Sequence, residues 1–280
     1  MDYVSPSSLT GAPPRQTGAL TLKGIRKQFN FRDRELKVLA GFDLSVNPGE
    51  FVSIVGPSGC GKSTLLRLIA GLDDAYEGTI TLDGQRVVGT SLERGLVFQD
   101  HRLFPWMTLE DNIALALTNR PLSKAAKAKL VAEHIALVGL KGFEKAWPHQ
   151  LSGGMAQRAA IARALVNEPK VLLLDEPFGA LDALTRIHLQ KELQRIWLAS
   201  GATMIMITHD VEEALYLGDR VVVMQANPGR IVHTVDVELP HPRDRASPVL
   251  HRLKDEIIAE LTETPEDNAT VVPLHKGEPR

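Results

Sequence analysis

Residues 51–71 read FVSIVGPSGCGKSTLLRLIAG, and this stretch decides the fold. Its first five residues form an uninterrupted apolar run, which is typical of a strand buried on both faces. A glycine-rich loop follows, and the residues after the loop have helical periodicity up to Gly71, a residue type that often ends helices. The order of strand, loop and helix predicts the first unit of a parallel sheet covered by helices.

The loop itself matches the phosphate-binding pattern G-x-x-x-x-G-K-[ST]. Its glycines allow the backbone to curl so that N–H groups face a phosphate, and the start of the helix adds its positive end. Lys62 is expected to reach the β and γ phosphates, Ser63 to place its hydroxyl on Mg²⁺, and Thr64 to contact the phosphates. The predicted nucleotide-binding residues are Gly56, Pro57, Ser58, Gly59, Cys60, Gly61, Lys62, Ser63 and Thr64. The loop alone separates neither ATP from GTP nor a hydrolase from a small-molecule kinase.

Two adjacent acidic residues follow a second buried run, VLLLD at 171–175. Asp175 is expected to support Mg²⁺, through a water molecule. Glu176, at the tip of the strand, is placed to polarise the water that attacks the nucleotide. The pair favours nucleotide hydrolysis.

The remainder of the chain predicts an α/β fold with two additions to the parallel core sheet. The runs TMIMIT at 203–208 and RVVVM at 220–224 are further buried strands separated by a helical segment. Alternating apolar residues before the loop, and an Asp83-Gly84 hairpin signal after it, predict an antiparallel β lobe. A helical pattern that begins with a Thr108 capping box predicts a helical subdomain at about 100–165.

Three segments are predicted along the chain. They are a flexible N-terminal tail at 1–18, one folded unit at 19–245, and a C-terminal helix with a flexible tail at 246–280. The first segment lacks the basic start and apolar stretch of a signal peptide. No apolar run approaches the roughly 20 residues that a membrane-spanning helix needs.

Composition excludes several classes of protein. With 280 residues, 44% of them hydrophobic and 24% charged, the chain is globular rather than disordered or fibrous. Its formal net charge of −2 provides no general basic field for nucleic acid. The one cysteine cannot form an intramolecular disulfide, and no histidine spacing indicates a metal site other than Mg²⁺.

The motif that points to a family is LSGGMAQR at 151–158, which is followed by AAIARAL. The phosphate loop, LSGGMAQR, VLLLDEP and GALD follow one another along the chain in this order. On these motifs, residues 20–240 resemble the nucleotide-binding subunits of ABC transporters. The resemblance implies an ABC-type nucleotide-binding domain of the P-loop NTPase class that pairs head to tail with a second copy, each signature closing on the ATP of the other. The residues expected to act across this homodimer are Ser152, Gly153, Gly154, Met155 and Asp182.

The resemblance also assigns roles to single residues. Gln99 matches a glutamine that contacts Mg²⁺ or the attacking water, and a polar strand cap is its structural alternative. His209 matches a switch histidine that contacts the γ-phosphate and holds the catalytic acid. Phe29 matches an aromatic residue that stacks on adenine, with Phe31 as the competing candidate. The expected catalytic residues are Lys62, Gln99, Glu176 and His209, and the expected Mg²⁺ ligands are Ser63, Gln99 and Asp175.

The segment FQDHRLFPWMTLEDNIALAL at 98–117 resembles the nitrate, sulfonate and taurine importer branch of the family. In that branch this surface receives a short cytoplasmic helix of the permease, so Leu103, Pro105 and Trp106 are expected to be available to a partner. The alternative is that Phe104 and Trp106 pack under the helical subdomain.

The resemblance therefore implies an ATPase on the cytoplasmic face of the cell membrane, the inner membrane where there are two. It would drive import as a peripheral dimer with two integral-membrane permease subunits and an external solute-binding protein. Nitrate, an aliphatic sulfonate or taurine all remain open as the solute, because partner proteins select it. A soluble ABC ATPase acting on DNA or ribosomes and a P-loop small-molecule kinase are the rival interpretations.

Overall fold

The computed structural model describes residues 17–31 and 34–262. The predicted flexible tails therefore lie outside the described residues, apart from their innermost positions. Gly18, which the sequence assigned to the N-terminal tail, is held in place: its N–H donates to Asp83 Oδ1 at 2.7 Å and its carbonyl accepts from the Thr203 hydroxyl at 2.9 Å. Among the described residues, no helix is both long and apolar enough to cross a bilayer.

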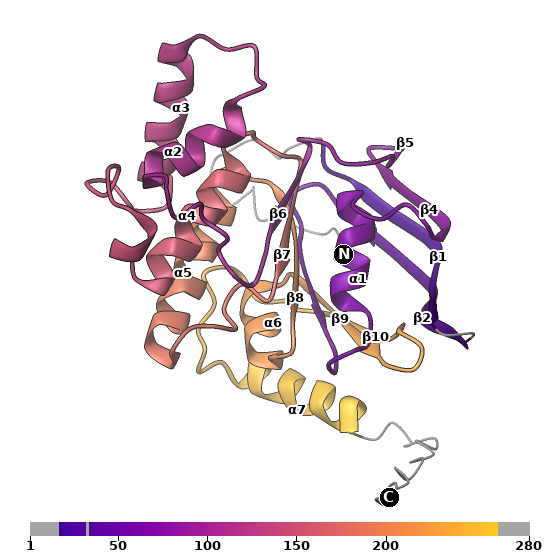
Figure 1. Cartoon of the computed structure of the whole chain (residues 1–280). Coiled ribbons are helices and arrows are strands. Elements are labelled where there is room, and N and C mark those ends of the chain that lie inside the picture. Colours follow the sequence, from indigo (N-terminus) through magenta and orange to yellow (C-terminus); the bar gives the residue numbers. More distant parts are fainter. Residues whose placement is uncertain (1–16, 32–33, 263–280) are drawn as a thin grey trace, which may run out of the picture.

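A six-stranded sheet forms the centre of the molecule (Figure 1). Its strands are β3 (Phe51–Val55), β6 (Arg94–Val97), β7 (Val171–Asp175), β8 (Thr203–Thr208), β9 (Arg220–Gln225) and β10 (Arg230–Asp236). The spatial order is β10-β9-β3-β8-β7-β6, and every pairing is parallel except that of β10 with β9. All residues of β3 and β8 are buried, as their unbroken apolar runs predicted. The parallel arrangement brings the carboxyl ends of β3, β6, β7 and β8 to one edge.

The predicted antiparallel lobe is a second sheet, and its strands are β1 (Leu20–Phe31), β2 (Arg34–Val46), β4 (Glu77–Leu82) and β5 (Gln85–Arg86). They lie in the order β2-β1-β4-β5. The hairpin between β4 and β5 turns at Asp83 and Gly84, with φ of 51° and 76°, as the sequence signal predicted. The helix α1 (Lys62–Ala70) lies between the two sheets and shares one apolar core with both (Figure 1).

The helices on the other side of the central sheet form two groups (Figure 1). They are α2 (Leu109–Ala114), α3 (Lys124–Leu137), α4 (Gly153–Leu165) and α5 (Ala183–Ser200), with short 3-10 turns at Leu115–Leu117 and Pro148–Gln150. Of these, α4 and α5 pack against the sheet, while α2 and α3 pack mainly on α4. Alternate residues of β7 serve the two cores: Leu172 and Leu174 face this helical side, whereas Val171 and Leu173 face α1. Thr108 caps α2, since its Oγ1 accepts from the N–H of Asp111 at 3.2 Å, but the Asp111 carboxylate accepts from the Thr108 hydroxyl at 2.6 Å rather than from its N–H, so the predicted capping box is only half formed.

The C-terminal part closes the sheet with α6 (Val211–Leu217) and α7 (Pro248–Thr262). The buried Arg243 guanidinium donates to the carbonyls of Leu215 and Gly218 at the end of α6, and to Val237 beyond β10. Helix α7 packs its apolar face, including Leu250 and Ile257, against β9 and α6. This segment fixes α6, which follows the loop that carries His209.

Candidate nucleotide-binding and hydrolysis site

The glycine-rich loop connects the end of β3 to the start of α1, and only glycine suits three of its positions. Gly59 and Gly61 have φ of 81° and 96°, a region that other residues rarely adopt. A Cβ on Gly56 would lie 2.5 Å from the carbonyl oxygen of Met224 on β9. The loop is therefore wound tightly against the carboxyl edge of the central sheet.

The N-terminus of α1 carries no side-chain cap. Its N-cap is Gly61, which has no side chain to accept a hydrogen bond. Side chains cap the next five α-helices, namely Thr108, Ser123, Ser152, Asp182 and Asp210 on α2 to α6. Backbone N–H groups at a helix start attract anions when no side chain occupies them. The start of α1 is thus available to a phosphate.

Lys62 lies over the same loop. Its side chain is buried, and its ammonium donates to the carbonyls of Gly56 and Pro57 at 2.7 and 3.0 Å. Its Nζ also lies 3.8 Å from the sulfur of Cys60. Burial raises the pKa of the Cys60 thiol, and the neighbouring Lys62 opposes this shift. The thiol is therefore held in its neutral form inside the loop.

Asp175, at the end of β7, faces the loop across a short gap. The hydroxyl of Ser63 donates to its Oδ1 at 3.1 Å. Burial raises the pKa of Asp175 and the adjacent Glu176 adds to this, while the hydrogen bond from Ser63 and the charges of Arg102 and Lys62 lower it. A hydroxyl and a partly buried carboxylate next to a phosphate site are the oxygen ligands that Mg²⁺ prefers. The residues present therefore fit this cation.

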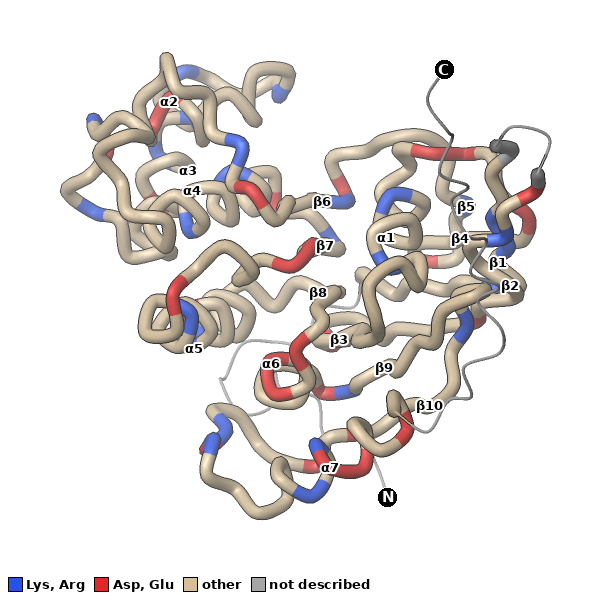
Figure 2. The backbone as a smooth tube through the Cα atoms, turned by 60° about the horizontal axis from the view of Figure 1, so that its bottom comes forward, with Lys and Arg blue, Asp and Glu red and all other residues tan. Residues whose placement is uncertain are grey.

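Glu176 and His209 come together from neighbouring strands. Glu176 has a φ of +44°, which is uncommon for a residue with a side chain, and its N–H donates to the Ile207 carbonyl at 3.0 Å. Its Oε2 lies 3.1 Å from Nδ1 of His209, which follows β8. Figure 2 shows acidic positions directly after β7, on the edge where α1 begins. The Glu176 carboxylate thus lies against the His209 ring, with 24% of its side chain exposed.

Gln99 lies beyond the end of β6, on the same edge. Its side chain is exposed, and a Cβ added to Gly179 would lie 2.9 Å from its Nε2. Gly179 belongs to the turn after Glu176. The N–H of Gly179 closes this turn by donating to the Glu176 carbonyl at 3.1 Å. The structure thus brings Lys62, Ser63, Gln99, Asp175, Glu176 and His209 to one edge of the sheet.

The signature residues lie elsewhere. Ser152 Oγ accepts from the N–H of Met155 at 3.3 Å and so caps its own helix, α4. A Cβ on Gly154 would lie 2.8 Å from Cγ2 of Thr185, so this glycine allows α4 to approach α5. Asp182 caps α5 by accepting from the N–H of Thr185 at 3.1 Å, and hydrogen bonds from the side chain and then the backbone of Thr185 hold the pKa of Asp182 below its usual range. Asp182 is therefore the N-cap of α5.

These residues do not reach the chain's own phosphate loop. Within the described part of the chain, no hydrogen bond or ion pair joins residues 152–155 or Asp182 to residues 56–64. A separate groove of about 320 Å³ lies between α4 and α5, lined by Ser152, Met155, Leu184 and others. Leu184 is 80% exposed at this groove.

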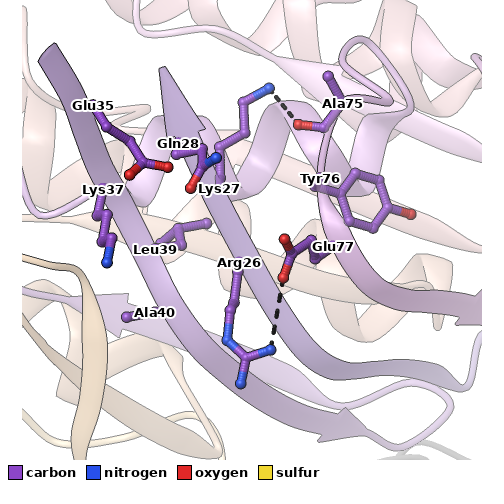
Figure 3. A pocket seen from close by; sticks show the side chains of 10 residues that line it. All are labelled: Arg26, Lys27, Gln28, Glu35, Lys37, Leu39, Ala40, Ala75, Tyr76 and Glu77. Atoms are coloured by element: carbon purple, nitrogen blue, oxygen red, sulfur yellow. Dashed lines mark hydrogen bonds and ion pairs between the residues drawn. The ribbon is translucent and has the colours of Figure 1, made fainter. Parts of the chain in front are cut away.

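Phe29 lies on the antiparallel sheet with 42% of its surface exposed. The ammonium of Lys27 is 4.7 Å from its ring centre, and this buried lysine donates to Asp73 and to the Ala75 carbonyl. A cavity of about 560 Å³ lies nearby (Figure 3). Neither Phe29 nor a loop residue lines it, and an Arg26–Glu77 ion pair of 3.7 Å crosses its rim. The side chain of Phe31, the competing candidate, lies outside the described residues.

One sequence expectation is wrong. Leu103, expected to face a partner, is only 7% exposed and belongs to the core of the helical side. Trp106 is 67% exposed, and its ring lies 5.4 Å from that of the half-buried Phe104. An apolar residue adjacent to a loop can pack inward or outward, and periodicity does not distinguish the two in an irregular segment.

Sequence reasoning also missed two side chains that hold this loop. The fully buried Asn112 of α2 accepts from the N–H of Phe104 at 2.8 Å and donates to three carbonyls. Arg163 of α4 donates to the carbonyls of His101 and Arg102. A polar residue in an otherwise apolar helix face, as in LEDNIAL, was the signal that could have identified Asn112.

Known proteins resemble this chain over most of its length. A family model described as ABC transporter matches residues 39–179. The aliphatic sulfonates import ATP-binding protein SsuB of Bacillus licheniformis is 49% identical over 246 residues, which are 88% of this chain and 95% of that protein. A bicarbonate transport ATP-binding protein of Synechococcus elongatus is 47% identical over 247 residues, 85% of this chain but 37% of that longer protein.

A solved structure gives a similar result. It is a dimeric post-hydrolysis state of an ATP-binding cassette bound to ADP and Pi, with a TM-score of 0.68 and 32% identity. The match covers 79% of this chain and 99% of that one.

Proposed function

This chain belongs to the ABC transporter family, and on that premise we propose that it is the ATP-hydrolysing subunit of an importer for a small solute, with an aliphatic sulfonate as the first solute to test. The observation that carries the proposal is the 3.1 Å contact between Glu176 and His209 beside the uncapped start of α1. An acid and a histidine at this place serve hydrolysis. Nitrate and taurine are the other candidate solutes.

Nucleotide binding is assigned to the glycine-rich loop. Its N–H groups and the ammonium of Lys62 would hold the phosphates, and Phe29 would stack on adenine. Ser63 and Asp175, with Gln99 nearby, would hold Mg²⁺, which when bound neutralises phosphate charge. Because Lys62 now donates to two loop carbonyls, those hydrogen bonds would be exchanged for contacts with phosphate.

Hydrolysis is assigned to the edge formed by β7 and β8. Glu176 would orient a water molecule and accept its proton as the water oxygen attacks the γ-phosphorus, while the bond to ADP breaks. His209 would hold the Glu176 carboxylate through Nδ1 and leave its other ring nitrogen for the γ-phosphate. Gln99 would contact the same water.

The second half of each site would come from another copy of the chain. In the part of the chain that the structure describes, no hydrogen bond or ion pair joins residues 152–155 or Asp182 to the glycine-rich loop of their own chain. The groove beside them exposes Leu184, an apolar residue that a partner would cover. We therefore assign a homodimer in which two ATP molecules lie between opposed loops and signatures.

The transport partner would dock on the loop that follows Gln99. Trp106 is exposed there, and Asn112 and Arg163 hold the loop firmly to the helical side. A permease pair in the membrane would contact this surface, and an external solute-binding protein would deliver the solute. The chain would then lie peripherally on the cytoplasmic face of the cell membrane.

Two neighbouring residues test the docking surface. Trp106→Asp is expected to abolish solute uptake while the ATPase rate of the isolated protein is kept, because the indole is on the surface. Leu103→Asp is expected to lower thermal stability sharply, since it buries an unpaired charge. Uptake by membrane vesicles and thermal denaturation measure the two effects. Normal uptake by Trp106→Asp would remove this residue from the docking surface.

The function itself is tested by purifying tagged Glu176→Gln protein from solubilised native membranes with ATP present. Mass spectrometry is expected to identify a multi-span permease, and ligand screening of the associated solute-binding protein would then identify the solute. Recovery of ribosomes or DNA-bound proteins without a membrane protein would replace the importer with a soluble ABC ATPase.

A further inference from the structure

Glu213 is a buried carboxylate on α6 that the proposed mechanism does not use. Only 6% of its surface is exposed. Its Oε2 accepts from the Thr208 hydroxyl at 2.8 Å, and its Oε1 accepts from the Gln190 amide at 3.0 Å. The guanidinium Nε of Arg186 lies 3.7 Å from Oε1. Two helices and one strand end therefore meet on this single carboxylate.

The carboxylate is linked through the Thr208 hydroxyl to the backbone on both sides of His209. Thr208, which precedes His209, donates to Glu213 and also accepts from the N–H of Asp210 at 3.1 Å. Asp210, which follows His209, caps α6 by accepting from the N–H groups of Glu212 and Glu213 at 2.8 and 3.2 Å. The His209 side chain itself is 60% exposed. Because little packing holds the imidazole, its position depends on the backbone that carries it.

The same carboxylate links this segment to α5. Arg186 and Gln190 are both on α5, the helix that Asp182 caps. Arg186 also lies 3.8 Å from the carboxylate of Asp210. A void of about 10 Å³ is lined by Glu176, His209, Thr208, Arg186 and Glu213 among others, so the network borders the Glu176–His209 pair directly.

Arg245, in the C-terminal segment, supports the residues that contact Glu213. Arg245 donates to Oε1 of Gln190, and its guanidinium carbon lies 3.9 Å from the ring centre of Tyr216 on α6. Gln190 is therefore held from both ends, by Glu213 and by Arg245. The C-terminal segment thus holds Gln190 of α5, whose side-chain amide donates to Glu213.

Burying this carboxylate is costly. Burial raises the pKa of Glu213 and the neighbouring Asp210 adds to this, whereas Thr208, Arg186 and Gln190 oppose it. An apolar residue would pack at the position without that cost. A buried carboxyl group that accepts two hydrogen bonds and lies 3.7 Å from the Arg186 guanidinium, next to the candidate catalytic pair, indicates a role in placing that pair.

We propose that Glu213 is a positioning residue for ATP hydrolysis, which fixes the Thr208–Asp210 segment and fastens it to α5 so that His209 stays against Glu176. Since Glu213 acts through His209, its role rests on the function proposed above. Substitution of Glu213 should slow the chemical step and leave nucleotide binding unchanged, because in the described part of the chain no hydrogen bond joins Glu213 to the glycine-rich loop at 56–64.

The test compares Glu213→Gln and Glu213→Ala with wild type in steady-state ATPase assays. Glu213→Gln keeps the volume of the side chain and protects against failure to fold, but it cannot accept from both donors. Each variant is expected to lower kcat by about tenfold or more, the scale of a small misplacement of a reacting group. The KM for ATP and the affinity for a fluorescent ATP analogue are expected to stay at wild-type values.

Glu50→Gln is the matched control. Glu50 is 3% exposed, accepts from the N–H of Asn47 at 2.7 Å and pairs with Arg220 at 3.0 Å. Burial raises its pKa as it does that of Glu213. It precedes β3, at the end opposite the glycine-rich loop. The control is expected to lose stability without a comparable loss of kcat.

A double-mutant cycle with His209→Ala separates positioning from general structure. If Glu213 acts through His209, then Glu213→Gln adds little further loss of single-turnover rate in the His209→Ala background. A full additional loss in that background would overturn the proposal. Wild-type kcat in both Glu213 variants would overturn it too, as would a loss of nucleotide affinity parallel to the loss of kcat.

Glu176→Gln distinguishes this inference from the proposed function. If Glu176→Gln abolishes hydrolysis while the Glu213 variants keep it, only the role of Glu213 is wrong. If Glu176→Gln hydrolyses ATP at the wild-type rate, the proposed function fails and the role of Glu213 fails with it.

Discussion

The starts of α1 and α4 are both built from small residues, yet they differ in what surrounds them. At α1, Gly61 provides no side-chain cap, and Lys62 and Asp175 of the same chain lie beside the free N–H groups. At α4, Ser152 caps its own helix and is exposed, and among the described residues no hydrogen bond joins it to Lys62, Gln99, Glu176 or His209.

The difference supports the proposal that one chain holds the nucleotide at α1 and that a second copy completes the site with its α4. The start of α1 is surrounded by groups that can hold a phosphate and activate water. The start of α4 lies apart from those groups and is capped by its own Ser152. In the proposed dimer each start of α4 meets the nucleotide held by the other chain.

The largest expected effect comes from removing the acid beside α1. Glu176→Gln is expected to slow hydrolysis by about 10²-fold or more, the usual scale for loss of a general base. ATP binding should be retained. ATP-bound dimers should accumulate, because the dimer dissociates only after ATP hydrolysis. ATPase assays and size-exclusion chromatography with ATP measure both effects.

Glu168→Gln is the control for that variant. Glu168 is an exposed residue that shares the left-handed backbone of Glu176, with φ of 54°, but lies outside the site. It should hydrolyse ATP normally and remain monomeric after turnover. Equal rates for Glu176→Gln and wild type would exclude Glu176 as the base.

A smaller effect is expected at α4. Ser152→Ala removes the cap of α4, at a cost of about 0.5–2 kcal/mol in stability. If the hydroxyl also meets the partner's phosphate, loss of a hydrogen bond to a charged group should lower ATPase activity by about tenfold or more. The nucleotide affinity of the monomer should not change. This result would show that the start of α4 differs in role from the start of α1, which we assign to nucleotide binding.

Ser123→Ala provides the comparison, because Ser123 caps α3 in the same way, with Oγ accepting from the N–H of Ala126 at 3.2 Å. It should lose similar stability and keep its ATPase activity. Were the two serine variants to lose activity equally, the start of α4 would have only a structural role.

The smallest effect concerns the thiol next to α1. Burial raises the pKa of Cys60, so less thiolate is present at any given pH, and alkylation should accelerate only above the ordinary thiol range of about 8.5. The rate of iodoacetamide labelling against pH measures this, with the urea-unfolded chain as the control. Bound MgATP should slow labelling, and labelled protein should lose hydrolysis. Full ATPase activity after stoichiometric labelling of Cys60 would contradict the assignment of nucleotide binding to this part of the glycine-rich loop.

Much of the fold could be predicted from local patterns. The unbroken apolar runs of β3, β7 and β8 predicted buried parallel strands, and Asp83-Gly84 predicted its hairpin. Burial on both faces of a parallel sheet leaves little choice of residue type, so these patterns are distinct. The position of Leu103 could not be predicted, because an irregular segment has no period that assigns a face.

The sequence by itself determined the α/β fold, the phosphate loop and the order of its motifs, because glycines, β-branched runs and acidic strand ends are local requirements of the backbone. Only the tertiary structure decided which side chains meet. The contact between Glu176 and His209, the contact between Ser63 and Asp175, and the burial of Glu213 of α6 against α5 each join residues far apart in the chain. Such contacts depend on strand order and helix packing, which local patterns do not fix.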